Sequence, residues 1–173
     1  AQALQVNSTL KSYHIDLSAC NNVQNDGVIA MAEALKVNVT LESYGIDLCR
    51  CQNVQNESVM AMADALKINS TLKSYHIDFS SCGNVQNEGV LAMADALKVN
   101  NTLESYHIKL FECQNVQNDG VMAMAEALKV NSTLLSYRIA FSSCKNVQND
   151  GVMAMADALK VNSTLELYRL DLF

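Results

Sequence analysis

The sequence predicts an α/β solenoid, a stack of similar strand-and-helix units. A 31-residue period runs through the 173-residue chain, one segment of each period has helical spacing, and another alternates as a half-buried strand does. Because one strand and one helix recur in every unit, we expect a horseshoe with parallel β-strands on its concave face and α-helices on its convex face.

The period is clearest where each predicted helix ends. The segment from Leu35 to Asn38 recurs from Leu66 to Asn69 and then three more times, always 31 residues later. A register without insertions indicates units that are physically stacked. We therefore expect residues 1–173 to form a single solenoid domain of five 31-residue periods plus a partial unit, without distinct capping repeats.

The helix of the first complete unit is predicted over residues 26 to 37. Its apolar residues recur at i, i+3, i+4 and i+7, on a face that we expect to be buried: Val28, Met31, Ala32 and Leu35. Lys36 in the last turn suits the helix dipole. Asn38 follows the helix, and asparagine at this position is typical of a left-handed cap.

The strand of each unit is predicted from an alternating segment, residues 12 to 17 in the first unit. Alternation places one set of side chains inward and the other outward: Tyr13, Ile15 and Leu17 against Ser12, His14 and Asp16. Equivalent residues of stacked units then lie about 5 Å apart, so the chain is best compared in columns.

The run from Ile15 to Cys20 resembles the Leu-x-Leu-x-x-Asn/Cys strand signature of leucine-rich repeats. The recurring helix exit Ala-Leu-Lys-Val-Asn-x-Thr-Leu is similar to that of the ribonuclease-inhibitor-like branch, which includes NOD-like receptors and tropomodulin. This resemblance covers the entire chain. It implies a role in protein binding, since that branch includes inhibitors, sensors, actin-capping proteins and scaffolds.

The unit departs from that family in its length. It is longer than usual, and Tyr13 stands where a leucine is expected. Two arrangements accommodate the difference: the strand carries two extra residues before Ile15, or the loop after Leu17 is expanded.

One cysteine column recurs with the period: Cys20, Cys51, Cys82, Cys113 and Cys144. The family resemblance implies that this side chain points inward and bonds the loop backbone of the next unit, which would make a structural ladder of reduced thiols. Disulfides are the alternative, but five thiols in register cannot all pair. Cys49 with Cys51, and His76 with His107, are too few ligands for a zinc site, so we expect neither metal nor cofactor.

The candidate binding surface is the outward side of the strands, together with its rim. These columns differ between units, whereas the exposed helix positions hardly change. This contrast favours a surface diversified for binding over free drift of exposed positions. The candidate residues are His14, Asp16, Gly45, Asp47, His76, Asp78, His107, Lys109, Phe111, Arg138, Arg169 and Asp171.

Charge patterning supports the stacking. Lys11, Glu42, Lys73 and Glu104 alternate in sign along one column, which would place opposite charges side by side between units. Each exposed pair is worth about a few tenths of a kcal/mol. Along each helix, an acidic residue three positions before a lysine gives a solvated ionic face.

Several function classes are disfavoured. The formal charge of −6 and the scattered 12 Lys and Arg argue against nucleic acid. No apolar stretch reaches the roughly 20 residues of a membrane span. The sequence has no glycine-rich phosphate loop and no nucleophilic serine motif, so we expect no enzyme.

Free cysteines favour a reducing, cytoplasmic location. An Asn-x-Thr sequon in each unit leaves secretion as the alternative, although its regularity favours a structural role: Asn7, Asn38, Asn69, Asn100, Asn131 and Asn162.

Two functions remain. The first is a non-catalytic interaction or scaffold module that binds a protein on its concave face. The second is a structural array that assembles end to end, since the chain begins in mid-helix at Ala1 and ends just after a strand at Phe173. The same ends also fit a fragment of a longer array or an artificial consensus-like one.

Overall fold

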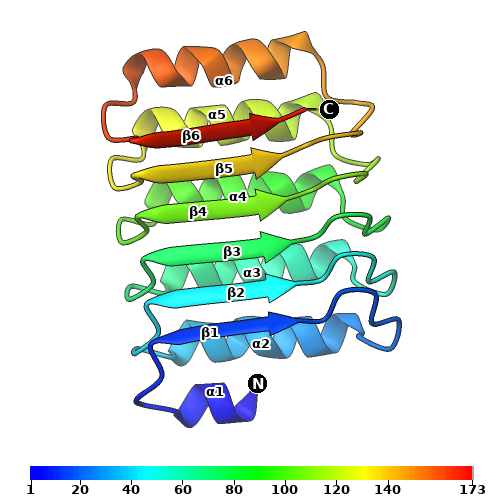
Figure 1. The fold of residues 1–173 in the computed structure, drawn as a ribbon, viewed down its shortest axis with the longest axis vertical. Helices are drawn as coiled ribbons and strands as arrows, with labels where there is room; N and C mark the ends of the chain where they lie inside the picture. The colour runs from blue at the N-terminus through cyan, green and yellow to red at the C-terminus, as the bar shows by residue number, and fades with distance from the viewer. Residues whose placement is uncertain (173) are drawn as a thin grey trace.

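The computed structural model describes residues 1–172, in which helices and strands alternate strictly (Figure 1). The helices are α1 (Gln2–Val6), α2 (Asn25–Val37), α3 (Asn56–Ile68), α4 (Asn87–Val99), α5 (Asn118–Val130) and α6 (Asn149–Val161). The strands are β1 (Ser12–Asp16), β2 (Ser43–Asp47), β3 (Ser74–Asp78), β4 (Ser105–Lys109), β5 (Ser136–Ala140) and β6 (Leu167–Asp171). No helix in this described part is long and apolar enough to cross a membrane.

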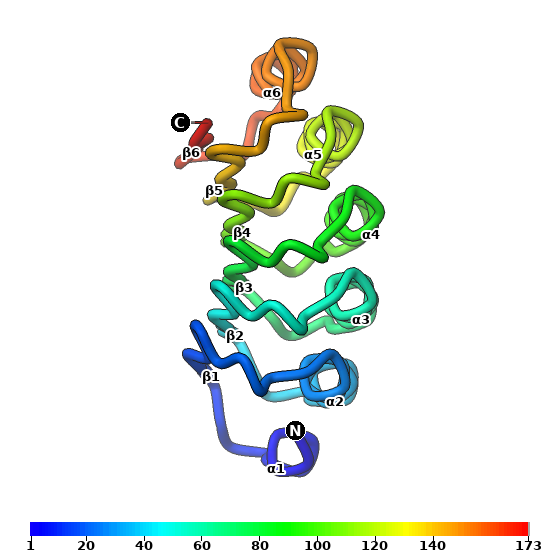
Figure 2. The backbone as a smooth tube through the Cα atoms, turned by 90° about the vertical axis from the view of Figure 1, so that its right-hand side faces the viewer, coloured from blue at the N-terminus to red at the C-terminus, as the bar shows by residue number. Residues whose placement is uncertain are grey.

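The strands form one parallel sheet in the order β1 to β6, and each residue pairs with the equivalent residue of the next unit, as Tyr13 does with Tyr44. Figure 2 shows the helices on the outer side of an arc and the strands on its inner side. Packed helices lie about 8–10 Å apart and paired strands about 4.8 Å apart, so stacking the two layers bends the array towards the sheet. The predicted α/β solenoid is confirmed.

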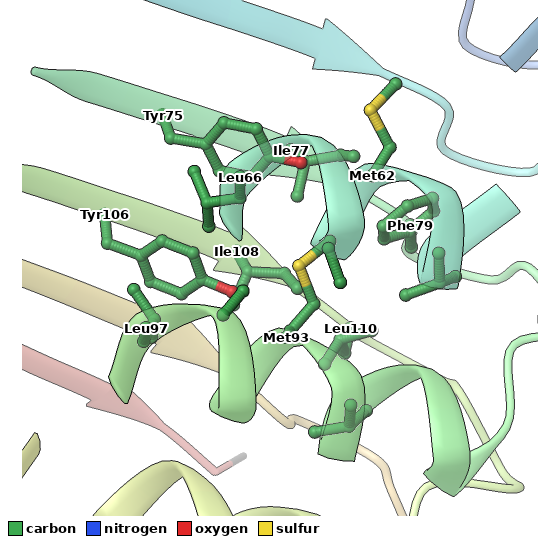
Figure 3. Close-up of a cluster of buried hydrophobic side chains, with 14 of the residues drawn as sticks. Met62, Leu66, Tyr75, Ile77, Phe79, Met93, Leu97, Tyr106, Ile108 and Leu110 are labelled. Atoms are coloured by element: carbon green, nitrogen blue, oxygen red, sulfur yellow. The ribbon is translucent and has the colours of Figure 1, made fainter. Parts of the chain in front are cut away.

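The core lies between the sheet and the helices. The predicted buried helix face is confirmed, with Val28, Ala32 and Leu35 at most 1% exposed. In Figure 3, Tyr75 and Ile77 point from the sheet towards Leu66 of α3. Each inner layer continues into the next unit, so the core is one uninterrupted cluster.

Tyrosines form the most regular of these layers. Adjacent rings from Tyr13 to Tyr168 are stacked, with centroids 5.8–6.0 Å apart. The hydroxyls of four of them are buried and have no hydrogen-bond partner in the described chain: Tyr44, Tyr75, Tyr106 and Tyr137. A tyrosine thus fills the position of the expected leucine, at the cost of a buried polar atom.

The extended segment is longer than the strand bounds suggest. Backbone hydrogen bonds join the first two units from the Lys11 carbonyl, which accepts from Glu42 at 2.8 Å, to the Ala19 amide, which donates to Cys49 at 2.7 Å. The paired segment therefore spans residues 11 to 19, and Cys20 follows Leu17 at the spacing of the signature.

The left-handed cap expected at Asn38 is wrong. Its backbone is extended, with φ −74° and ψ 125°. In this conformation Nδ2 donates to the carbonyls of Leu4 at 2.8 Å and Asn7 at 3.1 Å, while Oδ1 accepts from the backbone of Thr40 at 3.0 Å and Leu41 at 2.8 Å. The side chain therefore bridges two units as well as closing its own turn.

The same bridge recurs at the equivalent asparagines of the later units: Asn69, Asn100, Asn131 and Asn162. In each case the amide nitrogen that a glycan would occupy already donates to a carbonyl of the preceding unit. The interpretation of these sequons as framework is thereby supported by hydrogen bonding.

The cysteine column points inward, but its expected direction of bonding is wrong. Cys51 Sγ donates to the Leu17 carbonyl of the preceding unit at 3.1 Å, and Cys82 Sγ does the same to Leu48 at 3.1 Å. The Leu17 amide donates to Asp47, so its carbonyl also faces the next unit. A thiol that donates to this carbonyl therefore belongs to the following unit and points towards the preceding one. All six cysteines are free, and Cys20 is exposed.

Candidate functional site

The structure gathers the candidate residues on the concave face, which we define as two outward columns of β1–β6 and the rim beyond them. The first column reads His14, Gly45, His76, His107, Arg138 and Arg169, and the second reads Asp16, Asp47, Asp78, Lys109, Ala140 and Asp171. Phe111 lies on the rim, two residues after Lys109. Within one strand the outward residues alternate with inward ones, so the concave face is a direct product of strand periodicity.

Gly45 allows three imidazoles to gather. A Cβ at this position would collide with Nδ1 of His14, so the His14 ring lies directly over the Gly45 backbone. Its centroid is 6.2 Å from that of His76, although their strands are separated by β2. The His76 and His107 rings stack with centroids 4.3 Å apart. A residue without a side chain thus brings His14 towards the histidine pair.

Burial disfavours the protonated form of both stacked histidines. Burial lowers the pKa of His107 to about 4, and the neighbouring His76, Lys109 and Arg138 act in the same direction. Burial also lowers the pKa of His76. Within residues 1–172, no group of three or more His, Cys, Asp or Glu is arranged to hold a metal ion.

The second-column aspartates have a structural role that the sequence interpretation missed. Oδ1 of Asp16, Asp47 and Asp78 each accepts a hydrogen bond, at 2.8–2.9 Å, from the backbone amide two residues later. These bonds close the turn at which the chain leaves the strand. The recurring Asp-x-Ser or Asp-x-Cys pattern was the available signal.

Two of the cations on the concave face are already paired. Lys109 Nζ lies 3.0 Å from Oδ2 of Asp78, which is 5% exposed. Arg169 Nε lies 2.9 Å from Oδ2 of Asp171 on the same strand. Arg138 lies between them on β5, is exposed, and has no acidic partner within ion-pair distance among the described residues.

A second repeated polar surface lies at the helix starts and was not foreseen. Asn56 Oδ1 accepts hydrogen bonds from the amides of Gln86 at 3.2 Å and Gly89 at 3.1 Å, in the next unit. Shallow polar hollows follow these loops, one of them lined by Gln55, Asn56, Glu57, Asn84 and Gln86. Since the asparagine oxygens are engaged by the backbone, this surface is framework, and the recurring Asn-Val-Gln-Asn motif is its sequence signal.

The predicted charge patterns are confirmed. Lys11 Nζ lies 2.9 Å from Glu42, and Lys73 Nζ lies 3.9 Å from Glu104, so the alternating column forms ion pairs across units. On the convex face each helix lysine pairs with the acid three residues earlier, as Lys36 does with Glu33 at 2.6 Å. These exposed pairs support register and solubility, and none of them belongs to the concave face.

The sequence matches no known family model and no curated protein sequence. Solved structures share the fold. Actin-binding site 2 of leiomodin-1 is 22% identical, with a TM-score of 0.64, over 93% of this chain and 86% of that one. The C-terminal domain of tropomodulin from Caenorhabditis elegans is 14% identical, with a TM-score of 0.63, over 93% and 89%. A chain of the yeast Rad7–Elc1 complex is 16% identical, with a TM-score of 0.50, over 95% of this chain and 43% of that one.

These structures have in common the alternation of parallel strands and helices. The fold of this chain is accordingly that of a leucine-rich repeat, in units of 31 residues.

Proposed function

We propose that the chain is a non-catalytic protein-binding module whose concave face holds the partner. One observation carries this proposal: neighbouring strands keep nearly the same inward residues, but their outward residues change from an aspartate on each of β1–β3 to a lysine or arginine on each of β4–β6, with Asp171 as the remaining acid on β6. An identical scaffold with a graded surface suits recognition of one extended partner.

The structural neighbours support a protein partner in general terms. One neighbour is an actin-binding site, and another belongs to a two-protein complex. Because identities of this size establish only the fold, the partner's nature has to come from the concave residues themselves. The buried reduced thiols suit a reducing compartment, so we place the protein in the cytoplasm as part of this proposal.

The test compares concave and convex variants against the same partner. A partner isolated with the intact chain is purified and its affinity measured by calorimetry. We expect His76→Ala and Arg138→Ala to weaken binding by about tenfold each, the effect of about 1.4 kcal/mol. Glu33→Ala on the convex face is the control and should leave affinity unchanged. Equal affinities for all three variants would refute a concave binding surface.

End-to-end assembly is the second candidate. Its support is that β1 and β6 present open edges at opposite ends of the described array, where Lys11 and Glu166 hold equivalent positions of opposite charge. Internally this column forms the Lys11–Glu42 pair at 2.9 Å. Assembly predicts that particle mass rises with concentration and that Glu166→Lys lowers it. A constant monomer mass in light scattering under reducing conditions would exclude this function.

A further inference from the structure

The two strand columns of the concave face contain three lysines or arginines, and one of them has no acidic partner among the described residues. Lys109 on β4 is paired with Asp78, and Arg169 on β6 with Asp171. Arg138 on β5, between His107 and Arg169 in register, has neither an ion pair nor a hydrogen bond within the described chain.

Ala140 explains why Arg138 is unpaired. The second column has aspartate in four units, at Asp16, Asp47, Asp78 and Asp171, and in β6 that aspartate pairs with the arginine two residues before it. In β5 the same geometry would place an acid beside Arg138, but the position is alanine. The small side chain therefore leaves the charge of Arg138 unmatched within its own strand.

Phe111 adds an apolar group to this surface. The rim column otherwise contains small side chains, namely Ser18, Cys49, Ser80 and Ser142. Phe111 is 38% exposed and lies in the turn after β4, the strand that pairs with β5. In register, Phe111 lies two residues beyond the Lys109–Ala140 pair, so the ring lies on the far side of Ala140 from Arg138 on the same face. Exposed aromatic side chains and arginines are both enriched in protein-binding hot spots.

We propose that Phe111, Arg138 and Ala140 form the anchor point of the concave face, which takes a protein segment carrying a carboxylate side chain next to an apolar one. The carboxylate occupies the place that aspartate holds in the other units, and the guanidinium fork suits it. This inference rests on the proposed function and narrows it to a partner chemistry.

Charge distribution favours a carboxylate-bearing protein over nucleic acid. A phosphate backbone requires a stripe of free cations, whereas the cations on either side of Arg138 are already paired. The chain also has a net charge of −6, which repels polyanions at longer range. A single carboxylate is therefore the better match for the guanidinium of Arg138.

The test is an NMR titration of the isotope-labelled protein with the peptide acetyl-Glu-Phe-Glu-amide. We expect saturable shifts at Phe111, Arg138 and Ala140. Arg138→Gln should raise the dissociation constant by about tenfold, as loss of a charged hydrogen-bonded pair does. Ala140→Asp should do the same while keeping the arginine, because it supplies the internal partner that β6 already has.

The control is Lys145→Gln, which removes one exposed positive charge outside the three anchor residues and should leave the dissociation constant unchanged. Circular dichroism confirms that each variant is folded. The inference is overturned if acetyl-Gln-Phe-Gln-amide binds as well, if Ala140→Asp binds like the parent, or if oligothymidylate shifts the same residues at lower concentration. Should the purified partner depend on His76 but not on Arg138, the concave module would stand and this anchor would fail.

Discussion

Asn56 and Gly89 join two consecutive helices: Oδ1 of the asparagine accepts a hydrogen bond of 3.1 Å from the glycine amide in the first turn of the next helix. The contact recurs from Asn87 to Gly120 at 3.1 Å. The starts of α4, α5 and α6 are therefore capped by the unit before them, which makes the stability of one unit depend on its neighbour.

The short distance between neighbouring helix starts predicts that a glycine-to-alanine substitution has opposite effects on stability at two positions. At Gly120 an added Cβ would lie 2.6 Å from Asn87 Oδ1 and 3.1 Å from a methyl of Val90, so Gly120→Ala should lower the free energy of unfolding by about 1–3 kcal/mol. At Gly27 nothing lies within 4 Å, and Gly27→Ala should raise it by up to about 1 kcal/mol through helix propensity. Urea unfolding measures both. The same sign for both variants would contradict the inter-unit cap.

The buried tyrosine hydroxyls predict a stabilising substitution. Tyr75 is fully buried, and its hydroxyl has no partner in the described chain. Tyr75→Phe should raise the free energy of unfolding by about 1 kcal/mol, because it removes an unsatisfied polar group and keeps the stacked ring. Tyr13→Phe, at the partly buried end of the stack, is the control and should change stability little. Destabilisation by Tyr75→Phe would mean that a bound water satisfies the hydroxyl.

His107 predicts how stability depends on pH. Its pKa is about 4 in the folded protein against an ordinary 6.5, so between these values the unfolded chain binds a proton that the folded chain does not. Stability contributed by the neutral imidazole is complete above pH 6.5 and is lost as the pH falls towards 4.

The variant His107→Gln removes this titration. Its urea midpoint should fall less than that of the parent between pH 7 and pH 4.5, although His76, whose pKa is also lowered, keeps part of the dependence. The difference between the urea midpoints of variant and parent at pH 8, where both histidines are neutral, serves as the internal control, because it measures the effect of the substitution without the titration. Parallel pH profiles would show that His107 is not held neutral.

Thiol reactivity tests the cysteine ladder. Cys51, Cys82, Cys113 and Cys144 are buried, and burial raises the pKa of Cys82 to about 12 and that of Cys144 to about 11. Since the thiolate is the reactive form, a disulfide reagent should modify only Cys20 and Cys49 in the folded protein. All six should react in urea, and Cys49→Ser should remove one of the two accessible thiols. Reaction of a third thiol before unfolding would contradict the ladder.

The sequence by itself determined the repeating architecture. The inward positions of Tyr13 and Ile15 and the buried face of Val28 follow from the 2.0 and 3.6 residue periods, which are properties of local backbone geometry. Stacking in register followed from the constant unit length, so the concave residues could be assigned before any coordinates were known.

Only the tertiary structure decided which atoms meet across units. Asn38 bonds a carbonyl 34 residues away, the Cys51 thiol turns back to the preceding unit, and His14 reaches over Gly45. Arg138 is likewise unpaired because of the residues around it in space. These contacts depend on the offset and curvature between neighbouring units, which no local periodicity encodes, because they arise from packing wide helices against closely spaced strands.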